Sequence, residues 1–226
     1  MITINNLNKS FGSKKVLHYI NIHFETGKVY GIVGQNGAGK TTLFRCIAGL
    51  EGHQGEITSE YPHLKNELGF LETNPTMMSL ITGWEYLKIL CSAKSIDTEN
   101  FEEQNIFDLP LNQYANTYST GMKKKLALMG VLLRKNKVLI LDEPFNGVDI
   151  QSNMIILDII QELKKLNKTI LISSHIFSTL RDSCDEIILL KNGRVEKRVL
   201  PQHFDSLEGE MKEMIKKNTA KSLTLE

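Results

Sequence analysis

Residues 34–42 read Gly-Gln-Asn-Gly-Ala-Gly-Lys-Thr-Thr, a glycine-rich loop that ends in a lysine and two threonines. Glycines in such a loop let backbone N–H groups turn towards phosphate oxygens, and the N-terminus of a following helix adds partial positive charge. With this spacing Lys40 can reach the β- and γ-phosphates, and the hydroxyl of Thr41 can ligate Mg²⁺. We therefore predict a nucleoside-triphosphate site made by Gly34, Gln35, Asn36, Gly37, Ala38, Gly39, Lys40, Thr41 and Thr42.

A strand must precede this loop and a helix must follow it, and the sequence supplies both. Residues 29–33 form an apolar run typical of a buried strand, and residues 41–50 suit a helix. A second apolar run, 137–142, ends in Asp142 and is followed by Glu143. Beside a phosphate loop, the first carboxylate can hold Mg²⁺ through water and the second can polarise a water for attack on the γ-phosphate. The alternative is that these acids merely end a strand, but the loop upstream favours the catalytic interpretation.

The composition excludes several classes of protein. The 226 residues are 41% hydrophobic and 23% charged, as in an ordinary globular domain. A net charge of +1 gives no electrostatic case for nucleic acid or for an anionic membrane surface. The three cysteines are far apart and form neither a disulfide framework nor a metal-ligand pattern, which predicts a reducing compartment. We see no signal peptide, and no apolar run approaches the ~18–20 residues that cross a bilayer.

Strands and helices alternate along the chain, which predicts an α/β fold with a largely parallel sheet and ligands at the carboxyl ends of its strands. Residues 82–85 have capping-box spacing and open a helical insertion within this core. Residues 169–173 suit a further strand, and Asn192-Gly193 suits a hairpin turn. The charged tail after residue 201 is expected to be helical, and it ends in Leu225-Glu226, which are either native or added residues.

The order of these elements resembles that of the ATP-binding cassette (ABC) ATPases over nearly the whole chain. Residues 118–122, Tyr-Ser-Thr-Gly-Met, resemble the signature sequence that precedes a helix. Residues 146–149 resemble the D-loop, and residues 173–175 resemble the H-loop, or switch. Phe11 takes the place of the aromatic residue that stacks on adenine, and Glu72 stands where the family has the Q-loop glutamine.

This resemblance implies a P-loop NTPase core of α/β class with a mostly parallel sheet, an N-terminal antiparallel β subdomain and an inserted α-helical subdomain. A single ABC ATPase domain would span residues 1–226. Its α/β core with the β subdomain would comprise residues 1–72 and 136–200, the helical signature subdomain residues 73–135, and the C-terminal tail residues 201–226.

The resemblance also implies ATP and Mg²⁺ as cofactors and assigns roles to single residues. Thr41 and Asp142 would hold Mg²⁺ with help from Glu72, whose carboxylate in place of an amide would make closure more dependent on Mg²⁺. Glu143 would activate the attacking water, and His175 would contact the γ-phosphate. On residue type alone His175 could simply end a strand, and Phe11 could belong to the core.

The signature implies a second copy of the protein. Ser119 and Gly121 precede a helix N-terminus, so a hydroxyl, backbone amides and the helix dipole can face a γ-phosphate. In the family that phosphate belongs to ATP on the opposing subunit, and two head-to-tail cassettes enclose two ATP molecules. Thr120 and Met122 depart from the usual Leu-Ser-Gly-Gly-Gln, but the residues that can meet phosphate are present.

Several other residues carry more ordinary interpretations. We read Lys123-Lys124-Lys125 as a solvated helix face, because acids elsewhere balance the charge. Trp84 and Met77-Met78 either face a partner or pack inside the helical lobe. The remaining histidines are read as structural or surface residues: His18, His23, His53, His63 and His203.

The resemblance implies the ATP-hydrolysing subunit of a transporter, working as a homodimer at the cytoplasmic face of a membrane with a permease on a separate chain. The short segment between Glu72 and Ser119 favours export. The alternatives are a soluble single-cassette ABC ATPase in macromolecular assembly or nucleic-acid handling, and a cassette that binds ATP without hydrolysing it. Intact Lys40, Glu143 and His175 argue against the last. The cargo, the transport direction, the permease and the choice between homodimer and heterodimer are left open.

Overall fold

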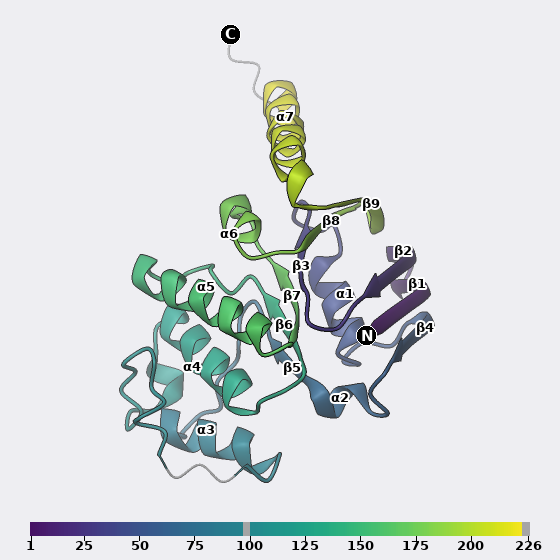
Figure 1. The fold of residues 1–226 in the computed structure, drawn as a ribbon. Helices are drawn as coiled ribbons and strands as arrows, with labels where there is room; N and C mark the ends of the chain where they lie inside the picture. The colour runs from purple at the N-terminus through teal and green to yellow at the C-terminus, as the bar shows by residue number, and fades with distance from the viewer. Residues whose placement is uncertain (97–99, 223–226) are drawn as a thin grey trace.

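The computed structural model describes residues 1–96 and 100–222, so Leu225 and Glu226 lie outside it. Its larger sheet has the strand order β5-β6-β7-β3-β8-β9 (Figure 1). Neighbouring strands run parallel from β5 to β8, and β9 is antiparallel to β8. The bounds are β3 Val29–Val33, β5 Leu68–Leu71, β6 Val138–Asp142, β7 Thr169–Ser173, β8 Glu186–Lys191 and β9 Arg194–Val199.

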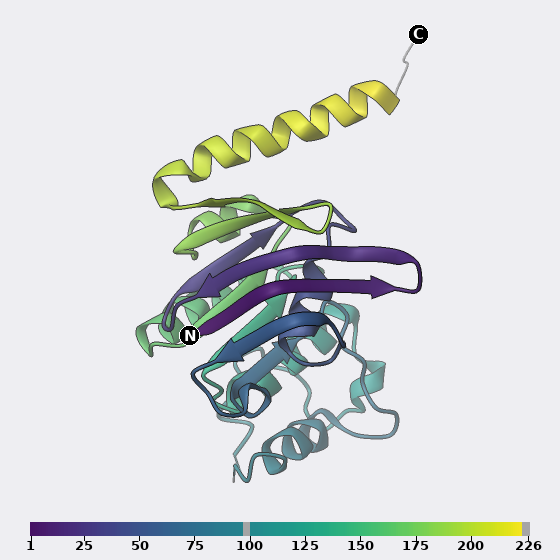
Figure 2. The same cartoon turned by 90° about the vertical axis from the view of Figure 1, so that its right-hand side faces the viewer.

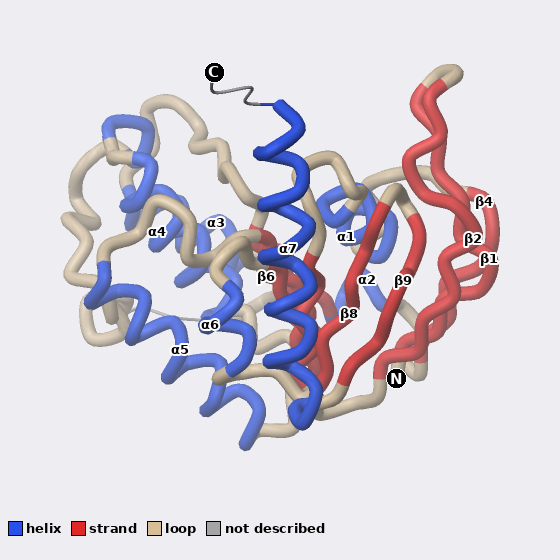
Figure 3. Tube along the Cα trace, turned by 90° about the horizontal axis from the view of Figure 1, so that it is seen from above, coloured by secondary structure: helices blue, strands red, loops and turns tan. Residues whose placement is uncertain are grey.

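A smaller antiparallel sheet stands beside the larger one, with the order β2-β1-β4. Helix α1 lies between the two sheets, and α4, α5 and α6 cover the opposite face of the larger sheet (Figure 3). These elements are β1 Ile2–Phe11, β2 Lys14–Phe24, β4 Gln54–Ser59, α1 Lys40–Ile47, α4 Thr120–Leu133, α5 Ile150–Lys165 and α6 Phe177–Arg181.

The uninterrupted apolar strands are explained by burial on both faces. Successive side chains of a strand point to opposite sides of the sheet. In β6, Leu139 and Leu141 therefore join the core beneath α4 and α5, whereas Val138 and Ile140 join the core shared with α1 and the smaller sheet. A strand buried on both sides has no polar face, so it shows no alternation.

The segment between β5 and β6 contains two α-helices and a 3₁₀ turn joined by loops, in keeping with the expected helical insertion. Thr82 and Glu85 form the predicted capping box at the start of α3. Within this segment, α3 (Gly83–Ser92) and the 3₁₀ turn Ala115–Thr117 precede α4. A short helix, α2 (Leu64–Glu67), lies before β5. The α/β fold class, with its mostly parallel sheet, antiparallel sheet and helices, is confirmed.

The C-terminal part begins with the predicted turn at Asn192-Gly193, whose positive φ angles of 48° and 71° suit a two-residue hairpin. After the 3₁₀ turn Pro201–His203, helix α7 (Phe204–Ser222) packs Phe204 and Leu207 into the core and then extends away from the body (Figure 2). Among the described helices, none has both the length and the apolar character needed to cross a membrane.

Candidate functional site

The loop between β3 and α1 has a backbone that requires glycine. Gly37 and Gly39 have φ angles of 81° and 107°, in the left-handed region that side-chain-bearing residues avoid. A Cβ on Gly39 would also lie 2.8 Å from Cδ2 of Leu17, so this position is packed as well as twisted. The loop therefore wraps round the N-terminus of α1 in the arrangement that presents backbone N–H groups to phosphate.

Lys40 lies across this loop. Its side chain is buried, and its Nζ donates a hydrogen bond of 2.8 Å to the carbonyl of Gly34. Burial lowers the pKa of Lys40, while the carboxylates of Glu143 and Asp142 oppose that shift. An ammonium group placed between the loop and two acids can bridge phosphate oxygens to the loop.

Asp142, at the end of β6, is the centre of a cluster of hydroxyl groups. Its Oδ2 accepts hydrogen bonds from Thr41 at 2.6 Å and from Thr73 at 2.7 Å, and its Oδ1 accepts one from Ser173 at 2.6 Å. These residues come from α1, from the segment after β5 and from β7. Because parallel strands end at one edge of the sheet, they meet there. A carboxylate with hydroxyl oxygens is a donor set that suits Mg²⁺.

Glu143, the next residue, points to a different partner. Its backbone N–H donates to Ser173 Oγ at 2.9 Å, and its Oε2 accepts from the backbone N–H of His175 at 3.1 Å. Oε1 lies 3.0 Å from His175 Nε2, yet it accepts no aligned hydrogen bond in the described part of the chain. Burial raises the pKa of Glu143, and the charges of His175 and Lys40 partly counter that rise. A buried carboxylate with one oxygen that lacks a hydrogen bond is a candidate general base for a water molecule.

Glu72 does not join the cluster around Asp142. Its carboxylate pairs instead with Nη1 of Arg45 on α1, at 2.5 Å. The neighbouring Thr73 makes the contact with Asp142. Consecutive residues of an extended chain point in opposite directions, so both side chains cannot reach the same oxygen. In this structure Thr73, and not Glu72, makes the contact with Asp142. That Glu72 assists Thr41 and Asp142 in holding Mg²⁺ stays a prediction, which a Mg²⁺ titration of Glu72→Gln tests.

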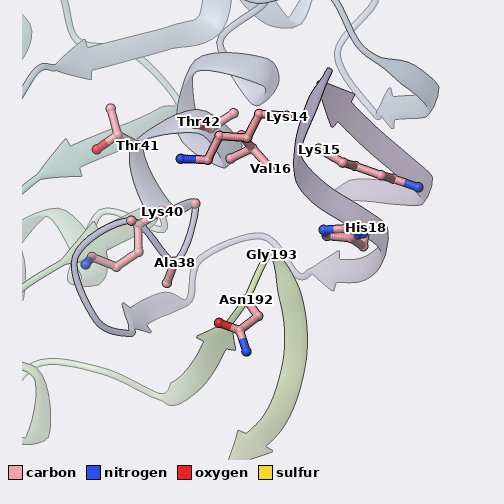
Figure 4. A pocket seen from close by; sticks show the side chains of 12 residues that line it. Lys14, Lys15, Val16, His18, Ala38, Lys40, Thr41, Thr42, Asn192 and Gly193 are labelled. Atoms are coloured by element: carbon pink, nitrogen blue, oxygen red, sulfur yellow. The ribbon is translucent and has the colours of Figure 1, made fainter. Parts of the chain in front are cut away.

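A cavity of about 430 Å³ adjoins the phosphate loop (Figure 4). It is bounded by the turn at Asn192-Gly193, where Gly193 accepts from the backbone N–H of His18 at 2.8 Å and donates to the carbonyl of Ala38 at 3.1 Å. The sequence indicated Asn192-Gly193 only as a turn and His18 only as a structural or surface residue, and it gave no sign that they line a cavity beside the phosphate loop. The cavity is lined by Lys14, Lys15, Val16, His18, Gly37, Ala38, Gly39, Lys40, Thr41, Thr42, Asn192 and Gly193.

Phe11 is not among the residues that line this cavity. It ends β1, its side chain is 48% exposed, and Nζ of Lys9 lies 4.5 Å from the centre of its ring. The structure thus places Phe11 outside the core. Its stacking on adenine stays a prediction.

The signature residues lie at the start of α4. Ser119 caps this helix, because its hydroxyl accepts a hydrogen bond from the backbone N–H of Met122 at 3.2 Å. Gly121 packs so closely against the D-loop that a Cβ would lie 2.6 Å from the carbonyl oxygen of Gly147. Asp149 caps α5 through Ser152. The residues that resemble the signature therefore pack directly against those that resemble the D-loop.

The sequence suggested that the three-lysine run is a solvated helix face, but the three side chains do not share one environment. Lys125 reaches Asp149 at 2.6 Å, and Lys124 is only 1% exposed. Since a helix turns about 100° per residue, neighbouring positions cannot share one environment. The expectation of a solvated face is wrong for Lys124.

We compared the sequence with models of known protein families. The sequence model of the ABC transporter family matches residues 17–146, which include the phosphate loop, the signature and the carboxylates at the end of β6. The chain belongs to this family. It is an ABC ATPase, the ATP-binding subunit of a transport system.

Two kinds of relative support this membership. The ABC ATPase is 31% identical over 227 residues to the lantibiotic transport ATP-binding protein SrtF of Streptococcus pyogenes, covering 92% of this chain and 93% of SrtF. A solved ATP-binding subunit of an ABC transporter has a TM-score of 0.83 at 25% identity, covering 92% and 93% of the two chains. The dimeric cassette MJ0796, bound to ADP and Pi after hydrolysis, shares the fold with a TM-score of 0.79 at 20% identity, covering 89% and 99%.

Proposed function

We propose that two copies of this ABC ATPase pair head to tail around two ATP molecules and that their hydrolysis powers export through a permease on a separate chain. The contact between Glu143 and His175 carries the hydrolytic part of the proposal. It places a buried carboxylate, one oxygen of which has no hydrogen bond, beside an imidazole, at the sheet edge where Lys40 and Asp142 also lie.

Each residue then has a role in the reaction. The loop of residues 34–42 binds the phosphates, and Lys40 neutralises part of their negative charge. Thr41 and Asp142 would hold Mg²⁺, which when bound neutralises charge on the β- and γ-phosphates. Thr73 would orient the carboxylate of Asp142. Glu143 accepts a proton from the attacking water as the water oxygen bonds to the γ-phosphorus and the bond to the leaving ADP oxygen breaks.

The second subunit would complete the site. Ser119 and Gly121 stand at the N-terminus of α4, whose unpaired N–H groups and dipole favour an anion. In the proposed dimer they meet the γ-phosphate bound by the other copy. The dimeric state of the cassette MJ0796 supports this arrangement.

The membrane partner would dock beside β5 and the helical segment. Met78, Leu80 and Ile89 expose apolar side chains there, with exposed fractions of 49%, 76% and 47%. Trp84, by contrast, packs edge-on against Phe101 with ring centres 5.7 Å apart, which supports its inward interpretation. Attachment to the permease would place the protein at the cytoplasmic face of the membrane. The transport function named for SrtF supports a permease partner.

The Glu143→Gln variant tests the catalytic part. It should bind ATP with native affinity, lose nearly all turnover and accumulate as an ATP-bound dimer on size exclusion. A monomeric variant with native turnover would refute the assignment. Co-purification with a polytopic membrane protein separates the transporter from a soluble assembly factor.

A further inference from the structure

Lys124, in the second turn of α4, is one of the largest fully buried side chains of the described protein. Burying an ammonium group costs free energy unless it is hydrogen-bonded. Its Nζ donates to the carbonyl of Glu143 at 2.7 Å and to the carbonyl of Asn146 at 2.8 Å. The buried ammonium group therefore binds the backbone of the segment that follows β6.

Glu143 needs such support, because its φ angle of 54° is in the left-handed region. For a residue with a side chain this conformation costs on the order of 1–3 kcal/mol and persists only where surrounding contacts impose it. Ser173 holds the N–H group of Glu143, His175 holds its carboxylate and Lys124 holds its carbonyl. Lys124 is the contact that comes from the signature helix.

We propose that Lys124 is a positioning residue that holds Glu143 in this conformation and so links the signature helix to the catalytic carboxylate of the same chain. The proposal rests on the role of Glu143 as the base. Two further contacts attach the start of α4 to the same segment: the Lys125–Asp149 ion pair and the packing of Gly121 on Gly147.

This link has a consequence for the dimer. The start of α4 faces the ATP of the second copy, whereas Glu143 acts on the ATP bound by its own chain. Movement of α4 towards the partner's γ-phosphate is transmitted through Lys124 to the backbone of Glu143. The two nucleotide sites are thereby coupled through the interior of each subunit.

The first experiment compares two substitutions of the buried lysine. Lys124→Met removes the N–H donors and keeps a flexible chain of similar length, whereas Lys124→Gln keeps N–H donors on a chain one bond shorter. Lys124→Met should lower kcat between about tenfold and hundredfold, since an ångström of misplacement costs on the order of a hundredfold. Its ATP Kd should stay native, and Lys124→Gln should recover part of kcat.

Lys165→Met is the matched control, because Lys165 is exposed and pairs only at the surface of α5 with Glu162. It should leave kcat, ATP affinity and the thermal unfolding temperature unchanged. Native kcat in Lys124→Met, with turnover lost in Glu143→Gln, would overturn the role of Lys124 alone. Turnover retained in Glu143→Gln would overturn the proposed function instead.

A double-mutant cycle separates positioning from general stability. If Lys124 acts through Glu143, adding Lys124→Met to Glu143→Gln should produce no further loss in single-turnover rate. Equal losses in both backgrounds would show that Lys124 supports the structure and not the base. Should Lys124→Met fail to fold, Lys124→Gln takes its place in the cycle, with the same two outcomes.

Discussion

Thr73 and Thr41 donate to the same carboxylate oxygen, Oδ2 of Asp142, at 2.7 and 2.6 Å. The two hydroxyls come from different elements, one from the segment after β5 and the other from the first turn of α1. Asp142 is fully buried, so these hydrogen bonds set the orientation of its carboxylate. Any cation held by Asp142 thus depends on both threonines.

Thr73→Val should weaken the use of Mg²⁺. The substitution keeps the shape of the side chain and removes the hydroxyl that Asp142 accepts from. Loss of such a supporting contact costs on the order of tenfold or more in metal affinity. ATPase activity titrated with Mg²⁺ should therefore show a half-maximal concentration raised by about tenfold.

Glu72→Gln is the matched control for that titration. Because Glu72 pairs with Arg45 and not with Asp142, its Mg²⁺ curve should coincide with the native one. A shift in the Glu72→Gln curve with a native Thr73→Val curve would restore the interpretation that the sequence first suggested.

The loss of kcat/KM at low pH should reflect protonation of Glu143. Burial raises the pKa of this carboxyl, so the base form is lost at a higher pH than for an exposed glutamate. The positive charge of a protonated His175 opposes that rise. His175→Ala should therefore raise the pKa of Glu143 further and move the acid limb of kcat/KM to higher pH. An acid limb that stays in place, or moves to lower pH, contradicts this coupling.

Lys40→Ala should lose affinity for ATP itself. Hydrogen bonds to a charged group are worth about 1.5–3 kcal/mol, which corresponds to a Kd about tenfold to hundredfold higher. Equilibrium binding of ATP measures the change directly. Lys165→Ala provides the comparison for loss of a lysine elsewhere, and equal affinities of the two variants would argue against a phosphate contact.

Gly193→Ala should disturb the phosphate loop from a distance. A Cβ at this position would lie 2.0 Å from the carbonyl oxygen of Val16 and 2.8 Å from Cδ2 of His18, so the turn must leave β2. The hydrogen bond to Ala38 is then lost. We expect a loss of about 1–3 kcal/mol in the free energy of unfolding and weaker ATP binding.

Gly12→Ala is the control that separates backbone strain at a positive φ angle from steric overlap of the added Cβ. Gly12 also has a left-handed φ angle, 57°, but a Cβ there would meet no atom within 4 Å. Chemical unfolding should show a smaller loss in the free energy of unfolding for Gly12→Ala than for Gly193→Ala, and the ATP affinity of Gly12→Ala should stay native. Identical behaviour of the two variants would mean that the contact of the turn with β2 is unimportant.

The sequence by itself determined the features that are contiguous along the chain. The phosphate loop, the buried strand that ends in Asp142 and Glu143, the capping box at Thr82 and the turn at Asn192 all follow from local patterns. Such patterns work because backbone freedom, helix capping and strand burial depend on neighbouring residues. The alternation of strands and helices sufficed for the fold class for the same reason.

Only the tertiary structure decided which side chains meet across the sheet edge. That Thr73 and not Glu72 reaches Asp142 depends on the direction in which the chain leaves β5, and residue type gives no signal of it. That Lys124 is buried against Glu143 depends on how α4 packs on the segment after β6. These contacts join residues far apart in the sequence, and packing between elements fixes their geometry.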